Sequence, residues 1–158
     1  MPDRLSLTSV VATLTLGVAP LAGCATFHVD AYPTEVGTQR DCDALLHDLP
    51  ASVDGLDRRT VEDDVAGAWG DPAVVLRCGV PADDEMQRCV RAGALTWFRS
   101  PLADGSLYSS SGRRFTVSVE VPRGRDTAQV LDDLLPALDR HDPRTAQPCT
   151  PGETRPAD

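Results

Sequence analysis

The chain has 158 residues, of which 41% are hydrophobic and 25% charged, which is the composition of a globular protein. Its 24 acidic residues outnumber its 15 basic residues, all of them arginine, and the net charge is −9. This balance argues against a nucleic-acid partner, which requires a concentrated cationic face. It also argues against adsorption to an anionic membrane, so any membrane attachment has to be hydrophobic or covalent.

The first part of the chain, residues 1–23, is typical of an export signal. Arg4 precedes an uncharged run, residues 5–19, which is shorter than the roughly 20 residues of a transmembrane helix. The next residues, Leu21-Ala22-Gly23-Cys24, resemble a bacterial lipobox, in which the cysteine thiol receives a diacylglyceryl group. We therefore expect a lipid on Cys24 that anchors the protein stably at the outer face of the cytoplasmic membrane. The alternative is an ordinary signal peptide that happens to end near a cysteine.

The exported part contains four further cysteines, and an even number in an oxidising compartment predicts two disulfides. They are Cys42, Cys78, Cys89 and Cys149. Of the three connectivities we favour Cys78 with Cys89, which would close a short excursion between two strands. Cys42 with Cys149 would then tie the first helix to a proline-rich tail. Zinc is the alternative, but the spacing from Cys78 to Cys89 is wider than the closely spaced pairs that bind this metal.

Residues 24–37 lack a helical period, which predicts a tether with a short strand at about 27–31. An amphipathic helix follows and stops at Pro50, because apolar side chains recur at helical spacing in Cys42, Leu45, Leu46 and Leu49. Thr38 and Asp41 resemble the capping pair at its start. A turn-rich stretch, residues 51–72, separates this helix from the next predicted element.

Three strands are predicted in the central part of the chain. The first is an apolar run at 73–78, and the second passes through 95–98. Residues 103–112 are polar and predict a flexible loop between strands. The third strand, at 114–121, is the clearest, because apolar and polar side chains alternate along it and predict one buried and one solvated face.

A second helix is predicted after Asp126 and Gln129, which resemble a capping pair. Its apolar positions are Val130, Leu131, Leu134, Leu135 and Leu138. Pro136 is expected to end or kink this helix near Leu135. From residue 142 the chain is rich in proline and threonine, and residues 150–158 are expected to be a disordered tail.

These elements predict a single α+β domain over residues 38–149. We expect a small antiparallel sheet of three to five strands, packed against two helices and stapled by disulfides.

Several short stretches together carry a resemblance to a known family. They are Leu49-Pro50, Val53-Asp54-Gly55, Arg58-Arg59, residues 69–81, Trp97-Phe98 and residues 117–122. The chain resembles the DUF3515 family of actinobacterial exported lipoproteins over about 42–149, and the stretch from Trp69-Gly70-Asp71-Pro72 to Arg77-Cys78-Gly79 is the most specific part. The family has no assigned activity. The resemblance therefore implies a compartment and a fold and supplies no catalytic residues.

The residue types that usually carry catalysis form no recognisable motif. His28, His47 and His141 stand far apart and outside the patterns of metal hydrolases, and they are expected to lie on the surface. The serine run at 109–111 lacks the glycines of a nucleophile elbow. Acidic runs at 62–64 and 83–85 place neighbouring carboxylates apart or in solvent. No metal or cofactor is expected.

One constellation is a candidate binding patch. Trp69 precedes a Gly-Asp-Pro turn that contains Asp71, Arg77 lies on the face of its strand opposite Leu76, and Trp97 is on the following strand. An aromatic and guanidinium patch across the sheet would suit a carboxylate or a sugar ring. The alternative is that both tryptophans pack in the core while Arg77 pairs with an acid such as Asp71.

We expect a non-catalytic binding or interaction module, anchored by its lipid, that recognises an envelope protein or a cell-wall component. A cell-wall hydrolase or transferase is the second hypothesis, with acids gathered from distant positions such as Asp71 and Glu120. A structural accessory of an envelope complex is the third. A concave pocket with convergent polar groups would favour the enzyme.

Overall fold

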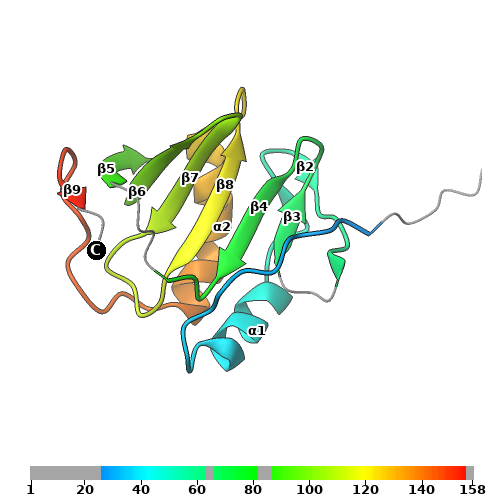
Figure 1. The fold of residues 1–158 in the computed structure, drawn as a ribbon, viewed down its shortest axis with the longest axis horizontal. Coiled ribbons are helices and arrows are strands. Elements are labelled where there is room, and N and C mark those ends of the chain that lie inside the picture. Colours follow the sequence, from blue (N-terminus) through cyan, green and yellow to red (C-terminus); the bar gives the residue numbers. More distant parts are fainter. Residues whose placement is uncertain (1–25, 63–65, 82–86, 156–158) are drawn as a thin grey trace, which may run out of the picture.

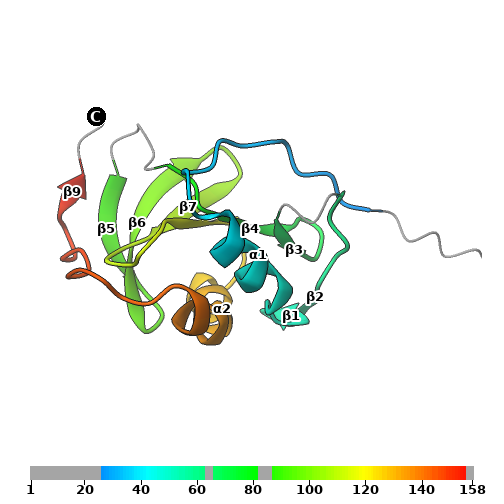
Figure 2. The same ribbon diagram turned by 90° about the horizontal axis from the view of Figure 1, so that it is seen from below.

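The computed structural model describes residues 26–62, 66–81 and 87–155. Its centre is a seven-stranded antiparallel sheet in the order β3-β4-β8-β7-β6-β5-β9. Two helices lie on one face of this sheet (Figures 1 and 2). The α+β class is thus confirmed, but the expected three to five strands are too few. The strands of the sheet are β3 Gly67–Trp69, β4 Val74–Cys78, β5 Gln87–Ala92, β6 Leu95–Leu102, β7 Gly105–Ser110, β8 Val117–Pro122 and β9 Thr154–Arg155.

The helices are α1 Gln39–His47 and α2 Thr127–His141, and a small ribbon of β1 Ser52–Val53 and β2 Leu56–Asp57 follows α1. The predicted cap of α2 is confirmed, because the Asp126 side chain accepts a hydrogen bond from the Gln129 amide. Thr38 precedes α1, but its hydroxyl donates to the carbonyl of Glu35 rather than capping the helix. Neither helix in the described ranges is long and apolar enough to span a membrane.

Helix α2 does not end at Leu135 but continues through Pro136 to His141. The proline removes one hydrogen bond of the helix and is exposed, so its ring lies on the solvent side. Ala137 and Leu138, beyond the proline, are buried in the main core. Burial of this last turn offsets the cost of the proline.

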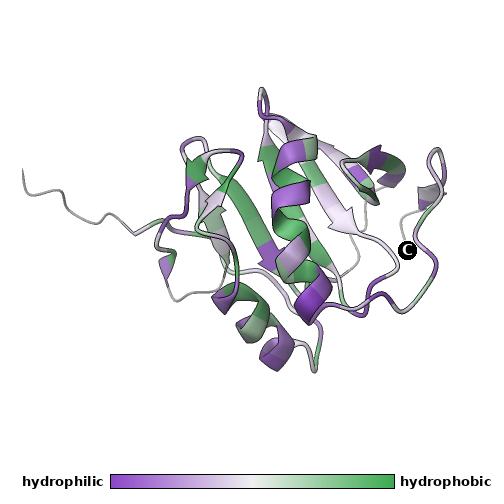
Figure 3. Ribbon diagram, turned by 180° about the vertical axis from the view of Figure 1, so that it is seen from behind, coloured by the Kyte–Doolittle hydropathy of each residue, from purple (hydrophilic) through white to green (hydrophobic). Residues whose placement is uncertain are grey.

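The main core lies between the helices and one face of the sheet. Val117, Val119 and Val121 of β8 face it, as the alternation in the sequence predicted. Figure 3 shows the hydrophobic strands running behind α2, while hydrophilic residues colour much of the outer side of the helix. The largest fully buried side chains in this core include Trp69 and Trp97.

The polar stretch that we expected to be a loop contains strand β7, in the middle of the sheet. Two of its buried serines form side-chain hydrogen bonds. The Ser106 hydroxyl accepts from Arg99 Nε at 3.0 Å, and the Ser110 hydroxyl accepts from the Val117 amide at 2.9 Å. Because these hydroxyls are satisfied, a serine-rich strand can lie in the interior at little cost.

The two disulfides are Cys42–Cys78 and Cys89–Cys149, so the favoured connectivity is wrong. We had expected the strands that carry Cys78 and Cys89 to be close, but β8, β7 and β6 lie between β4 and β5. Four steps of about 4.8 Å place them roughly 19 Å apart in a flat sheet, beyond the reach of a disulfide. Cys78 instead points toward α1, where Cys42 meets it.

The two ends of the described chain pack against the sheet. Residues 26–37, which we call the strap, cross the face opposite the helices rather than forming a free tether (Figure 2). A parallel bridge joins Phe27 to Val61, and the Glu35 amide donates to the carbonyl of Gly79. At the other end, β9 pairs with β5, so the described residues 150–155 are ordered where we expected disorder.

Candidate functional site

The strap is held on the open face of the sheet by three side chains. Phe27 packs under Arg59, whose guanidinium carbon lies 4.4 Å from the centre of the ring. Val29 is buried in a second, smaller apolar cluster that includes Val75 of β4. The Tyr32 hydroxyl accepts a hydrogen bond of 3.3 Å from the Cys78 amide, and burial raises the pKa of this tyrosine. The strap is therefore a built part of the domain.

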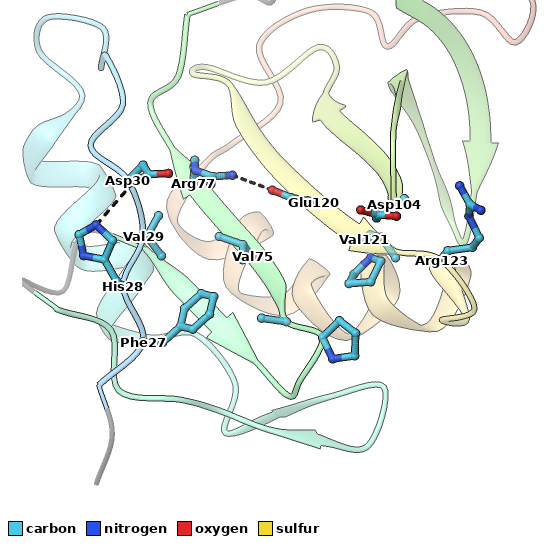
Figure 4. Close-up of a pocket in the computed structure, with 14 residues that line it drawn as sticks. Phe27, His28, Val29, Asp30, Val75, Arg77, Asp104, Glu120, Val121 and Arg123 are labelled. Carbon is cyan, nitrogen blue, oxygen red and sulfur yellow. Dashed lines mark hydrogen bonds and ion pairs between the residues drawn. The ribbon is translucent and has the colours of Figure 1, made fainter.

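A groove of about 680 Å³ lies between the strap and the sheet (Figure 4). One wall is residues 27–30 of the strap, and the floor includes Val75 of β4. The far side is formed by residues 120–123, at the end of β8, and by Asp104 in the turn between β6 and β7. Its volume falls within the roughly 300–1,000 Å³ that is common for ligand sites.

Arg77 and Glu120 close one end of the groove with an ion pair of 3.3 Å. The strand register explains this pair, because Val75 lies opposite Glu120 and Arg77 opposite Ser118. Arg77 and Glu120 are thus diagonal neighbours on the same face of the sheet. The Arg77 guanidinium also lies 5.8 Å from the ring of Tyr32, so it links the sheet to the strap.

Charged groups of both signs flank the apolar floor. On the strap, His28 lies 3.0 Å from Glu62 and 3.5 Å from Asp30. The hydrogen bond to Glu62 raises the pKa of His28 above its usual value. On the opposite side, Arg123 donates from its side chain to the carbonyl of Ala103, beside Asp104. A ligand in this groove would therefore meet apolar contacts below and separate positive and negative groups at the rims.

The structure does not bring the predicted patch of Trp69, Asp71, Arg77 and Trp97 together. Trp69 and Trp97 are 0% and 1% exposed in the core below the sheet, whereas Arg77 lies on the opposite face. Trp69 donates from Nε1 to the carbonyl of Pro50 at 3.0 Å. The alternative interpretation of the tryptophans is confirmed, but the acid that pairs with Arg77 is Glu120 rather than Asp71.

The residues proposed for an enzyme are also not assembled. Glu120 lines the groove and forms an ion pair with Arg77. Asp71 is exposed in the turn after β3 and is not among the described residues that line the groove. Within the described ranges, no group of three or more His, Cys, Asp or Glu side chains is placed to hold a metal ion. The acidic runs include residues 63, 64 and 83–85, which lie outside the described residues.

Sequence reasoning missed the groove itself. The lack of a helical period predicted a short strand at about 27–31, and the structure shows an isolated bridge at Phe27 there. The pattern does not reveal which surface receives its apolar side. That surface is formed by β4 together with residues near Val61, which come from elsewhere in the chain.

The same structure places a polar cluster where the two helices end. Asp48 Oδ2 accepts from His141 Nε2 at 2.8 Å and from Arg140 Nη1 at 3.0 Å, and Asp48 Oδ1 lies 3.1 Å from His47 Nδ1. These contacts, led by the hydrogen bond from His141, hold the pKa of Asp48 well below its usual range. The cluster joins the residue after α1 to the last turn of α2.

Comparison with known proteins places the chain in a family. Residues 4–146 match the family described as "Protein of unknown function (DUF3515)". Neither the curated proteins nor the solved structures give a match. Because the matched region is most of the chain, the protein belongs to the DUF3515 family.

Proposed function

We propose that this protein is a lipid-anchored binding module at the outer face of the cytoplasmic membrane. Its groove receives a segment of an envelope protein or a cell-wall component, and it does so without bond chemistry. The observation that carries this proposal is that the strap forms one wall of the groove. The anchor and the binding site are then parts of the same short segment.

The spacing along the chain supports this arrangement. Phe27 lies only three positions after Cys24 in the chain, and it is already packed against Arg59. An extended chain advances at most about 3.6 Å per residue, so a lipid on Cys24 would hold Phe27 within roughly 11 Å of the acylated residue. A groove that begins at Phe27 would therefore be presented close to the membrane surface.

The chemistry of the groove supports recognition rather than catalysis. Its apolar floor gives contact area, while His28, Asp30 and Arg123 at the rims give orientation. A general acid or base needs a poised side chain in reach of the reacting atom. The carboxylate of Glu120 is already engaged in an ion pair with the guanidinium of Arg77, at 3.3 Å.

The anchoring is tested by Cys24→Ala, with the wild-type protein compared in membrane and soluble fractions. We expect the variant to leave the membrane or to remain as an uncleaved precursor. A processed variant that stays in the membrane would show that lipidation at Cys24 is wrong.

The groove is tested by Ala73→Arg, which places a long charged side chain on its lining. Ala128→Arg is the matched control, because Ala128 is exposed near the start of α2. We expect membrane components recovered with the wild-type and control proteins to be lost with Ala73→Arg. Equal recovery with both variants, at equal thermal stability, would rule out the groove as the binding site.

A further inference from the structure

A second cavity, separate from the groove, lies where the segment after α2 passes the turn between β5 and β6. It has a volume of about 220 Å³. Three arginines line it, Arg91, Arg113 and Arg144. None of the described residues that line it carries a carboxylate. In a chain of net charge −9, this is a local concentration of positive charge against the overall balance.

The cavity is built by contacts that fix its walls. The Cys89–Cys149 disulfide ties the segment after α2 to β5. The Cys149 amide donates to the Ser111 hydroxyl at 2.7 Å, and Thr96 donates to the Cys149 carbonyl at 3.0 Å. The Thr145 amide donates to the Gly112 carbonyl at 2.9 Å. The walls are therefore positioned before any ligand arrives, which reduces the entropy cost of binding.

Arg113 is the fixed arginine of the cavity. Its side chain is 2% exposed, and it donates to the Asp142 carbonyl at 2.6 Å and to the Asp139 carboxylate at 2.7 Å. The carboxylate of Asp142 is turned to the Phe115 amide. The nearby acids are thus engaged with Arg113 or with the backbone.

Arg91 and Arg144 keep their charges uncompensated. In the described part of the chain neither forms an ion pair, and the guanidinium of Arg91 reaches only the Ala94 carbonyl, at 3.5 Å. The cavity therefore offers two positive charges that no carboxylate of the described residues neutralises. The Ser111 hydroxyl, which accepts from Cys149, retains a hydrogen to donate.

We propose that this cavity binds a phosphate group, with Arg91 and Arg144 as its charged ligands and Arg113 as the support beneath them. A phosphate monoester carries about −1.5 to −2 charges at neutral pH, which matches two free guanidiniums better than a carboxylate does. Arginine forks also suit the geometry of phosphate oxygens.

The size of the cavity agrees with this ligand class. The volume of 220 Å³ is many times the roughly 10–15 Å³ that a cavity needs to hold one water molecule. That space accommodates a phosphate and a few further atoms, but it is smaller than the roughly 300–1,000 Å³ of common ligand pockets. The rest of the ligand would extend into solvent, as a phosphorylated sugar or a lipid headgroup would.

The proposal is tested by isothermal titration of the full-length protein with glycerol 3-phosphate in low-salt, phosphate-free buffer. We expect one saturable site, and at least a tenfold loss of affinity in the double variant R91A/R144A. The matched control is R40A/R125A, which removes the same charge from positions outside both cavities. Absence of saturable binding, or an equal loss in the control, would overturn the proposal, as would acetate binding as tightly as the phosphate ester.

A second arm distinguishes a soluble phosphate from a lipid one. The same proteins, each carrying Cys24→Ala so that a lipid anchor does not itself retain them, are sedimented with vesicles of phosphatidylcholine, with and without phosphatidic acid. Retention that requires phosphatidic acid and is lost only in R91A/R144A would assign the phosphate to a lipid. Binding of glycerol 3-phosphate with equal sedimentation of all three proteins would assign it to a soluble ester. Equal sedimentation together with no binding of glycerol 3-phosphate contradicts the site.

Discussion

Arg77 and Glu120 join β4 to β8 across the face of the sheet that the helices leave open, with 3.3 Å between Nη1 and Oε2. The pair closes one end of the groove, and Arg77 also faces the ring of Tyr32 on the strap. Sheet and strap are therefore coupled at the same point that a bound ligand would touch.

This pair is expected to matter more for binding than for stability. The side chains of Arg77 and Glu120 are 23% and 41% exposed, so solvent screens their attraction. We predict that R77A lowers the free energy of unfolding by about 1 kcal/mol or less, as measured by urea denaturation. A double-mutant cycle with E120A should give a coupling energy in the same small range. A loss of several kcal/mol would instead assign the pair a structural role.

The disulfide pattern is directly measurable. Non-reducing peptide mapping should recover the links Cys42–Cys78 and Cys89–Cys149. The links close loops of 36 and 60 residues, for which the chain-entropy estimate is about 4 kcal/mol each. We predict that C42S/C78S loses up to this amount in urea denaturation. Recovery of a Cys78–Cys89 peptide would contradict the strand order of the sheet, since β4 and β5 are not neighbours.

Asp142 gives the protein a distinctive dependence on pH. It is 0% exposed, and burial raises the pKa of its carboxyl to about 6. The folded state thus binds this proton more tightly than the unfolded state, and its contribution to stability falls as the pH rises from about 4 to 6. A pKa difference of about two units between the folded and unfolded states corresponds to about 3 kcal/mol in the free energy of unfolding.

We predict that D142N, which keeps an oxygen for the Phe115 amide, is more stable than the wild type at pH 7 by up to about 3 kcal/mol. The difference should shrink toward zero at pH 4. Urea midpoints across this range test it. A difference that is constant with pH would show that the carboxyl of Asp142 does not titrate in this window.

The ionisation of Asp48 affects stability in the opposite direction from that of Asp142, because the pKa of Asp48 is lowered in the folded state. Because hydrogen bonds from His141, His47 and Arg140 hold its pKa below the usual value, its contribution is present above about pH 4 and is lost as the pH falls further. We predict that D48N is destabilised at pH 6 and approaches the wild type at pH 2. D43N, on the exposed side of α1, is the control and should follow the wild type throughout. If D48N and the wild type lost stability equally as the pH falls, the carboxylate of Asp48 would not be a source of the acid sensitivity.

Local patterns in the sequence were enough to predict several elements correctly. The alternation at Val117, Val119 and Val121 identified the face of β8 that meets the core, because a strand places successive side chains on opposite faces. The Asp126 cap marked the start of α2, because its contact with Gln129 is local. Such features depend on residues close together in the chain.

The errors concern relationships between distant segments. β4 and β5 are close in sequence but separated by three strands, which led to the wrong disulfides. β7 is rich in serine, and its burial depends on partners such as Arg99 that local hydrophobicity does not reveal. The candidate patch failed because Trp69 and Trp97 face the core while Arg77 faces outward, and the groove remained hidden because the surface under the strap comes from other segments.

The most direct test of the strap-walled groove is photo-crosslinking in intact cells. A photoreactive amino acid is placed at Asp30 on one wall, at Asp104 on the other, or at Ala128 on the outside of α2 as the control. The account predicts the same adduct from Asp30 and Asp104, none from Ala128, and loss of the adduct when Ala73→Arg is added. An adduct from Ala128 at equal yield, or none from either wall of the groove, would contradict it.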